Sequence, residues 1–302
     1  MTAMGKSASS HGVAVPLSSG HVETVLSEET PITPREYRDF QEFLEKTCGI
    51  RLGEKQEYLI VSRLSGLMAE QGMASLGHLL EALRQDAHGT LKTIVIDAMT
   101  TNETFWFRDM AHFRILSDTI FSGADRMHRP LRIWSAACST GQEPYSISMM
   151  AEEYRRVRPG RLPHDVEIVA TDISTRIVAE ASTGIYCGMT LSRGLTAQQR
   201  HRFFSPQGEC IRVNPEIRRR VEFRSMNLTQ DFSGMGRFDV IFCRNVLIYF
   251  SNALKKSILD KIAETLHPGG YLFVGSTESI SGFTGRFEMV AGHGGIAYRL
   301  KD

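Results

Sequence analysis

The spacing of apolar residues changes along the chain near residue 130. Before that point they recur every three or four positions, as in amphipathic helices, and Tyr37, Phe40 and Leu44 give one example. From Leu131 onward, short β-type runs alternate with helical patterns. The pattern therefore predicts a small all-helical N-terminal domain over residues 31–122, a linker over 123–130 and an α/β domain over 131–302.

Start signals support the helical part of this prediction. Thr33 can cap a helix that has Pro34 at its first position, and Glu36 can complete a capping box. Asp109 is expected to cap the last helix before the linker. Residues 1–30 are rich in Ser, Gly, Thr and His and lack periodicity, which predicts a disordered tail.

The α/β part is expected to fold as a doubly wound, seven-stranded Rossmann-like sheet. Strands alternating with helices favour parallel pairing, and the last two strands, joined across residues 292–295, predict a hairpin that makes one edge antiparallel. The alternation is interrupted at about residues 184–224, where short β patterns predict an inserted small β-subdomain. Three adjacent arginines, Arg218 to Arg220, are consistent with either a solvated surface or a partner-docking site. The expected strands lie near 131–137, 166–170, 221–226, 238–243, 271–275, 287–290 and 296–300.

The composition narrows the class of protein. With 42% hydrophobic and 23% charged residues and no apolar run of membrane-spanning length, a soluble cytoplasmic protein is expected. A formal charge of +1 provides no global field for nucleic acid. The five cysteines include no C-x-x-C pair, which suggests neither a disulfide framework nor a zinc site and indicates a reducing cytosol. The ten histidines fit no metal-ligand spacing, so no metal is expected.

Candidate chemistry lies in the loops after the predicted strands, because ligands of doubly wound sheets bind beyond the carboxyl ends of the strands. The loop after the first strand, residues 135–145, has small residues and one glycine but no G-x-G-x-x-G sequence. This disfavours NAD and fits a nucleoside without phosphates. Glu143 in this loop suits a cationic ligand group, or is simply a favourable charge at a helix start.

The other strand ends also carry polar residues. Asp172 follows the second strand and can accept hydrogen bonds from both ribose hydroxyls, although an acid there can also cap a helix. Asn227 and Leu228 can read and cover an adenine. Arg244 and Asn245 directly follow an apolar run, so they are not expected to be buried without a ligand or partner. The Asn-Pro-Pro-Tyr sequence of enzymes that methylate nucleic acid amines is absent.

Four motifs together resemble the chemotaxis receptor methyltransferases of the CheR family. They are Thr100–Arg108, Ser139–Tyr145, Ala170–Ile173 and Phe242–Phe250, and the resemblance extends from about Thr33 to the C-terminus. It implies the methyltransferase form of the Rossmann-like sheet, with S-adenosylmethionine as the methyl donor. The implied reaction is methyl transfer to glutamate side chains on the cytoplasmic helices of chemoreceptors, the expected partners of a monomeric enzyme that binds no nucleic acid and does not insert into membranes.

The same resemblance implies roles for individual residues. Arg108 and Tyr249 would be catalytic and face the incoming glutamate. Arg63 would bind the substrate helix, although residues 65–69 lack the further arginines usual in the family. The donor pocket would be lined by Asn102, Thr104, Arg108, Glu143, Asp172, Asn227, Leu228, Arg244 and Asn245.

This sparse set of residues suits the reaction. A glutamate is ionised at pH 7, so it needs neither a general base nor a metal to attack a sulfonium methyl, and positioning supplies roughly 7–11 kcal/mol. Residues 204–210 look shorter than the family loop that captures a receptor's C-terminal pentapeptide, so independence of that peptide is expected. Two alternatives remain: a methyltransferase of small molecules or nucleic acid, and a module that senses the donor without turnover.

Overall fold

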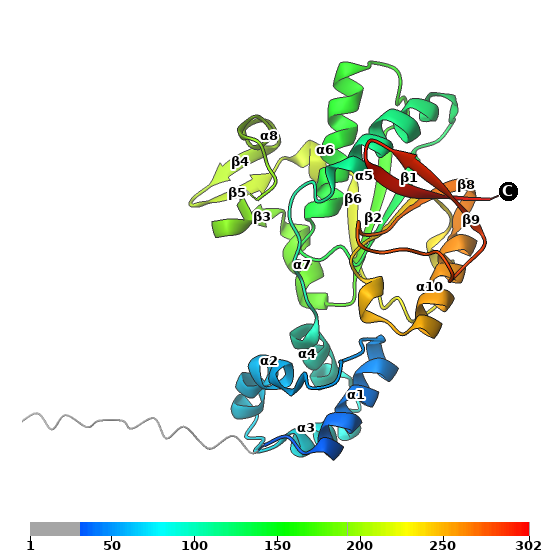
Figure 1. The fold of residues 1–302 in the computed structure, drawn as a ribbon. Coiled ribbons are helices and arrows are strands. Elements are labelled where there is room, and N and C mark those ends of the chain that lie inside the picture. The colour runs from blue at the N-terminus through cyan, green and yellow to red at the C-terminus, as the bar shows by residue number, and fades with distance from the viewer. Residues whose placement is uncertain (1–30, 192, 302) are drawn as a thin grey trace, which may run out of the picture.

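The computed structural model describes residues 31–191 and 193–301, so the predicted tail over residues 1–30 lies outside the described residues. The N-terminal part contains four helices that pack around one core (Figure 1). The helix predicted from Thr33 begins as expected, because the Thr33 hydroxyl and the Glu36 carboxylate form a complete capping box. These helices are α1 (Pro34–Cys48), α2 (Glu57–Glu70), α3 (Leu76–Gln85) and α4 (Thr90–Met99).

The C-terminal part contains a seven-stranded sheet in the order β6-β2-β1-β7-β8-β10-β9, which confirms the predicted fold class. Its first five strands pair in parallel, and β10 pairs antiparallel with both β8 and β9. β8 begins earlier than predicted, because Leu266 pairs with Phe238 across an irregularity in the register. The strands are β1 (Leu131–Ala136), β2 (Val166–Asp172), β6 (Val221–Ser225), β7 (Phe238–Cys243), β8 (Leu266–Phe273), β9 (Phe287–Gly292) and β10 (Gly295–Leu300).

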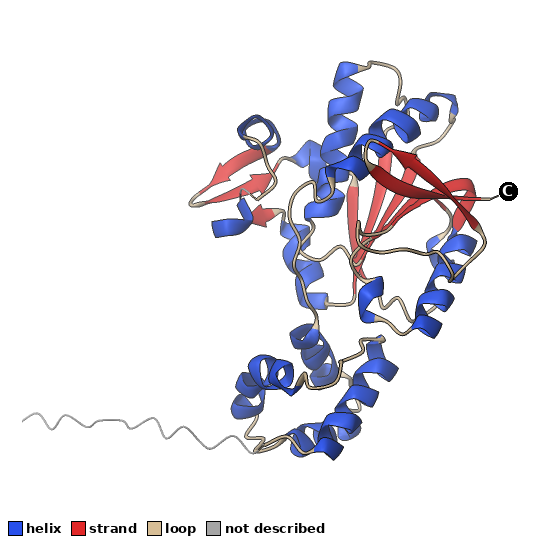
Figure 2. Cartoon of the chain, viewed as in Figure 1, coloured by secondary structure: helices blue, strands red, loops and turns tan. Residues whose placement is uncertain are grey.

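Helices cover both faces of this sheet (Figure 2). Because successive side chains of a strand point to opposite faces, Ile133 and Phe242 join the core beside α6, whereas Trp134 and Ile241 join the core beside α10. The covering helices are α5 (Met110–Ile115) with a π-helical continuation over Leu116–Phe121, α6 (Gln142–Val157), α7 (Thr175–Thr183) and α10 (Asn252–Thr265), and short 3₁₀ turns lie at Ala124–Arg126, Gly188–Leu191, Ser233–Met235 and Leu247–Tyr249.

Packing divides the chain earlier than the predicted linker at 123–130. Phe113, Leu116 and Ile120, which we assigned to the helical domain, are buried in the same core as Ile133 and Phe242 of the sheet. The core of α1 to α4 ends at Met99. Helical spacing shows which side of α5 is apolar but not which core covers that side, so the sequence pattern alone placed this helix with its neighbours along the chain.

A small antiparallel sheet, with strand order β3-β5-β4, lies apart from the large one (Figure 1). Contrary to the expectation from cysteine spacing, Cys187 and Cys210 form a disulfide within it. The bridge depends on strand register: Tyr186 pairs with Ile211, which places the two flanking cysteines opposite each other. The elements of this insert are β3 (Ile185–Tyr186), α8 (Ala197–Phe203), β4 (Phe204–Gln207), β5 (Cys210–Val213) and α9 (Pro215–Arg218).

The arginine run at the end of the insert, Arg218 to Arg220, is not uniformly solvated. The Arg220 side chain is 2% exposed and binds Glu152 and Asp165 at 2.6 and 2.8 Å. Arg218 donates to the carbonyl oxygen of Ser182, and Arg219 alone is exposed. Neither a solvated surface nor a partner-docking site therefore describes Arg220, which joins the start of β6 to α6 and to the α6–β2 connection. Across residues 31–191 and 193–301, no helix combines the length and apolarity needed to cross a bilayer.

Candidate active site

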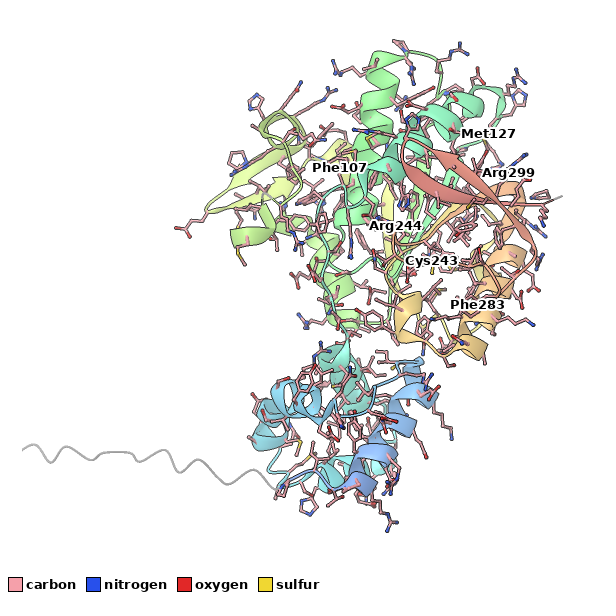
Figure 3. All side chains as sticks on the ribbon, viewed as in Figure 1. Phe107, Met127, Cys243, Arg244, Phe283 and Arg299 are labelled. Atoms are coloured by element: carbon pink, nitrogen blue, oxygen red, sulfur yellow. A yellow bond between two sulfur atoms is a disulfide. The ribbon has the colours of Figure 1, made fainter. Side chains whose placement is uncertain are left out.

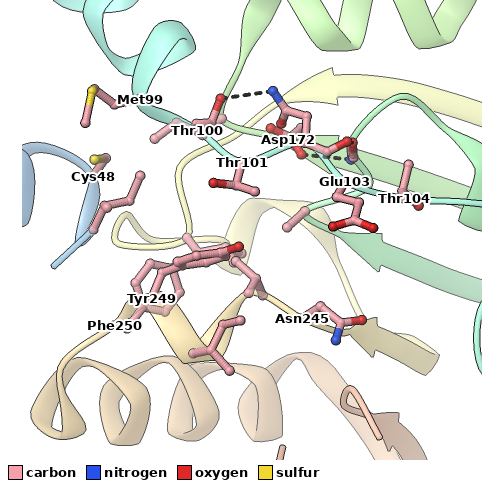
Figure 4. Close-up of a pocket in the computed structure, with 18 of the residues that line it drawn as sticks. Cys48, Met99, Thr100, Thr101, Glu103, Thr104, Asp172, Asn245, Tyr249 and Phe250 are labelled. Atoms are coloured by element: carbon pink, nitrogen blue, oxygen red, sulfur yellow. Dashed lines mark hydrogen bonds between the residues drawn. The ribbon is translucent and has the colours of Figure 1, made fainter. Parts of the chain in front are cut away.

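One cavity of about 340 Å³ lies between the carboxyl ends of the sheet strands and the helical N-terminal part (Figure 4). Its lining includes every residue singled out from the sequence as a donor, catalytic or substrate residue. Backbone and side chains of the α1–α2 connection, such as Ile50 and Leu52, complete the wall. Segments that are far apart in sequence therefore meet at one place.

A network of charges at the wall of this cavity is centred on Arg244. The Arg244 side chain is 2% exposed, and it binds the Glu143 carboxylate at 2.8 Å and the Asp109 carboxylate at 2.5 Å. Its guanidinium also donates to the carbonyl oxygen of Arg108. Figure 3 places Arg244 next to Cys243, inside the sheet domain. Glu143 accepts a further hydrogen bond from Ser135, so β1, β7 and the segment before α5 are tied together.

The network corrects the role expected for Asp109. Asp109 precedes α5, but its backbone is left-handed (φ 58°) and its side chain makes no capping hydrogen bond. Arg244 binds the carboxylate instead, and their attraction lowers the pKa of Asp109 despite its partial burial. Sequence reasoning missed this partner because the pairing exists only once β7 and α5 are brought together.

Asp172 lies buried at the end of β2. Its two carboxylate oxygens accept backbone hydrogen bonds from Ser139 at 2.9 Å and from Ser174 at 3.1 Å (Figure 4 shows the first). Burial raises the pKa of Asp172, and the backbone donors partly oppose that shift. Each oxygen keeps a further lone pair, so the side chain can still accept hydrogen bonds from a ligand in the cavity.

The loop after β6 is anchored from two directions. The side-chain amide of Asn227 donates to the carbonyl oxygen of Thr47 in α1, and its oxygen accepts from Thr229. Lys261 of α10 binds the carbonyl oxygens of Leu228, Thr229 and Gln230 at 2.6–3.1 Å. Asn227 therefore uses one of its side-chain hydrogen bonds to link the sheet domain to the helical N-terminal part.

The loop after β7 depends on an acid that the sequence did not single out, Glu278. Its carboxylate accepts backbone hydrogen bonds from Asn245 and Gly275, both at 2.7 Å, and from Ile248 at 3.2 Å. Asn245 itself is left-handed, with φ 57°. Glu278 thus sets the backbone path from Asn245 to Tyr249, but it lies in an irregular segment without any motif, so no signal pointed to it.

The segment between the two parts of the chain forms another wall. Asn102 donates to the Thr100 hydroxyl and accepts at its carbonyl oxygen from Ser139 (Figure 4 shows the first of these bonds). Arg108 donates to the carbonyl oxygen of Glu103 at 3.2 Å, and its guanidinium lies 5.6 Å from the centre of the Phe105 ring. Arg108 is therefore held at the cavity by weak contacts rather than by an ion pair of its own.

The helical part supplies the last wall. The Arg63 guanidinium donates to the carbonyl oxygen of Met99 at 2.6 Å and to the Thr101 hydroxyl at 3.0 Å. The backbone N–H of Arg51 binds the carbonyl oxygen of Tyr249 at 2.9 Å, and Tyr249 lies along the lower side of the cavity in Figure 4. Most of the hydrogen-bonding capacity of Arg63 is used within the chain.

Comparison with known proteins supplies the family. Residues 35–100 match the family model of the CheR methyltransferase, all-alpha domain, and residues 102–296 match that of the CheR methyltransferase, SAM binding domain. The chain belongs to the CheR methyltransferase family. The resemblance inferred from the motifs is confirmed, and the division between the two matches falls where packing places it.

Relatives in this family cover most of the chain. The "Chemotaxis protein methyltransferase Cher2" of Pseudomonas putida is 47% identical over 269 residues, which are 88% of this chain and 98% of that protein. "Chemotaxis protein methyltransferase 1" of Vibrio cholerae is 46% identical over 89% of this chain and 98% of its own. The Escherichia coli chemotaxis protein methyltransferase is 34% identical over 87% of this chain and 91% of its own.

The chain is an enzyme, a CheR methyltransferase that uses S-adenosylmethionine. The cavity fits that donor, because an adenosine with an amino acid end needs acceptors for its hydroxyls and ammonium together with apolar cover for its base. The acceptors are Asp172, which is buried, and Glu143, whose side chain is 12% exposed, and Met226, Leu228 and Val246 are the apolar neighbours.

Other side chains near the cavity carry no obvious chemistry. Cys138 and Cys243 are buried, and burial raises the pKa of both thiols well above the usual range, so they stay protonated. Within the described part of the chain, no three His, Cys, Asp or Glu side chains gather as metal ligands would. Metal independence stays a prediction.

Proposed function

We propose that this CheR methyltransferase transfers the methyl group of S-adenosylmethionine to glutamate side chains on the cytoplasmic helices of chemoreceptors. The observation that carries the proposal is that Arg108 and Tyr249 line the same cavity as Asp172 and Glu143. The names of the relatives, all chemotaxis protein methyltransferases, support the substrate class. We accordingly propose a cytoplasmic, monomeric enzyme with chemoreceptors as partners and no role for nucleic acid.

The roles of the donor-side residues follow from their positions. Asp172 would hold the ribose hydroxyls, and Glu143, backed by Arg244, would accept from the ammonium group. Leu228 would cover the adenine, while Asn102, Thr104 and Asn245 complete the wall. When bound, the donor supplies a methyl group on a positively charged sulfur. The protein's task is then to bind and to orient.

The substrate side needs a cation that aligns a carboxylate without quenching it. Glutamate is already ionised at neutral pH, so no side chain has to remove a proton. The Arg108 guanidinium can hold both carboxylate oxygens through its planar fork. Because Arg108 binds no carboxylate among the described residues, its charge would be available to the substrate. Tyr249, on the neighbouring wall, offers a hydroxyl donor to the same carboxylate.

Arg63 is proposed as a substrate-binding residue of the cavity wall. Since its guanidinium is bonded to Met99 and Thr101, it would act mainly by fixing the segment that leads to Asn102. Receptor helices would then be recognised mainly by the shape of the cavity wall at residues 99–102, and less by direct ion pairs with Arg63.

We further propose that the enzyme does not need a receptor pentapeptide. β4 and β5 are joined by the two residues Gly208 and Glu209, since Gln207 pairs directly with Cys210. A two-residue hairpin turn leaves no loop that could extend around an added peptide strand.

The proposal is tested by offering the enzyme labelled S-adenosylmethionine together with chemoreceptor cytoplasmic domains, RNA, DNA or a small-molecule extract. We expect label on receptor glutamates only, released by mild base as esters are. Label on nucleic acid or small molecules would favour the alternative methyltransferase. Donor binding by calorimetry without transfer to any acceptor would favour a sensing module.

A further inference from the structure

The inserted β-subdomain reaches back to the wall that carries Arg108. The backbone N–H of Trp106 donates to the carbonyl oxygen of Arg193 at 3.2 Å, and the Trp106 indole donates to the carbonyl oxygen of Thr190 at 2.9 Å. Gly194 has φ +95°, and a Cβ atom there would collide with the carbonyl group of Trp106. The insert therefore contacts the 103–108 segment closely, through backbone on both sides.

Two residues connect Arg193 with Arg108. The Arg193 guanidinium binds the Glu103 carboxylate at 3.0 Å and lies 4.3 Å from the centre of the Phe105 ring. Arg108 contacts the same two residues, through the Glu103 carbonyl oxygen at 3.2 Å and the Phe105 ring at 5.6 Å. Glu103 and Phe105 thus form a bridge between an arginine of the insert and an arginine of the cavity.

The charges on this bridge suggest what it does. Arg193 is the cation that binds the Glu103 carboxylate, and Arg108 is held next to the same residue by its backbone carbonyl. If Arg193 were lost, a rotation of the Glu103 side chain could bring its carboxylate to Arg108. An ion pair formed in that way would compete with a substrate carboxylate for the guanidinium.

We propose that Arg193 is a positioning residue: by binding Glu103 and stacking on Phe105, it keeps the Arg108 guanidinium free and directed to the substrate. The inference rests on the proposed function, because it takes Arg108 to be the group that orients the substrate carboxylate. It adds an active-site task for the insert that is separate from any recognition of receptor peptides.

The test compares steady-state methylation of chemoreceptor domains by the wild type and by Arg193→Ala. Misplacement of an orienting group lowers kcat and kcat/KM together, and we expect a loss of about tenfold to hundredfold. The dissociation constant for S-adenosylmethionine should change much less. Arg202→Ala is the matched control, since Arg202 also belongs to the insert, pairs with Glu153 and lies over Phe203. It should retain wild-type kcat.

A second variant separates positioning from a general loss of structure. Adding Glu103→Gln to Arg193→Ala removes the competing carboxylate and should restore most of kcat, whereas a merely disordered insert would not recover. Unchanged kcat in Arg193→Ala, or no recovery in the double variant, would overturn the inference.

The inference can also be decided without activity. If the wild type methylates no receptor domain, the proposed function fails, and a crystal structure of Arg193→Ala then decides the positioning role. Arg108 paired with the Glu103 carboxylate would support it, and an unmoved Arg108 would refute it.

Discussion

At the scale of single residues, the cavity wall contains two kinds of arginine: Arg244 is held in a network of ion pairs, whereas Arg108 is not. Arg244 binds both Glu143 and Asp109, and truncating it would leave two carboxylates without their cation. Arg108 has no carboxylate partner among the described residues and is partly exposed at the cavity. This absence of a carboxylate partner supports the proposal that Arg108 binds the substrate.

Arg108→Ala is expected to lower kcat/KM for receptor methylation by about hundredfold or more, because an orienting interaction made in the transition state is lost. Donor affinity should fall far less. Methylation kinetics and donor calorimetry on the same preparation check this. A variant that turns over as fast as the wild type would remove Arg108 from the mechanism.

His112 in α5 makes stability depend on pH. Burial, reinforced by Arg244, lowers the pKa of His112 to about 4, whereas an unfolded histidine titrates near 6.5. Between these values the unfolded chain binds the proton and the folded chain does not. The contribution to stability is therefore complete above about pH 6.5 and is lost as the pH falls toward 4, by up to about 3 kcal/mol.

Denaturant unfolding of the wild type and of His112→Gln at several pH values tests this. The stability of the variant should decline less steeply between pH 6.5 and 4. Parallel curves for the two proteins would show that His112 is not responsible.

Most residues of the candidate site could be predicted from the sequence, because the topology of a parallel sheet brings the strand ends together. Glu143, Asp172 and Arg244 each lie at or after the end of a strand that a short apolar run makes recognisable, and the ends of parallel strands meet at one edge. Glu278, Lys261 and Arg193 could not be found in this way. They contact loops that are distant in the sequence, and such contacts leave no local pattern.

At the scale of elements, the sequence pattern predicted part of the insert but not its disulfide. The pattern predicted that the insert contains β-strands and roughly which residues form it. It did not predict the Cys187–Cys210 disulfide, because this bridge depends on the register of β3 against β5. Reduction of this disulfide, or Cys187→Ser with Cys210→Ser, is expected to destabilise the insert by up to about 3 kcal/mol, the entropy of an open loop of that size.

Thermal unfolding with and without a thiol reductant measures this effect. The wild type should melt at a lower temperature when reduced, and the double serine variant should be insensitive to the reductant. A wild type whose melting is unaffected although both thiols become free would contradict the assigned role of the bridge.

The β4–β5 turn carries the prediction about receptor peptides. Because two residues close this hairpin, titration of the enzyme with a receptor C-terminal pentapeptide should give no saturable heat, and receptors lacking the peptide should be methylated as fast as those that carry it. Saturable binding together with faster methylation of peptide-bearing receptors would contradict it.

At the scale of the whole molecule, the cavity belongs to both parts of the chain. Arg51 and Thr47 of the helical part bind the backbone of Tyr249 and the side chain of Asn227 in the sheet domain. Periodicity predicted both folds, yet it placed α5 in the wrong core and could not show this junction. The reason is that contacts between elements far apart in sequence follow from shape and packing, not from spacing.

The proposed function requires this shared cavity to bind the donor, and a crystal structure of the enzyme with S-adenosylhomocysteine, the demethylated donor, would show whether it does. We predict the ribose at Asp172, the amino acid end near Glu143, and the sulfur facing Arg108 and Tyr249. The ligand bound at another place, or with its sulfur turned away from Arg108 and Tyr249, would contradict the account.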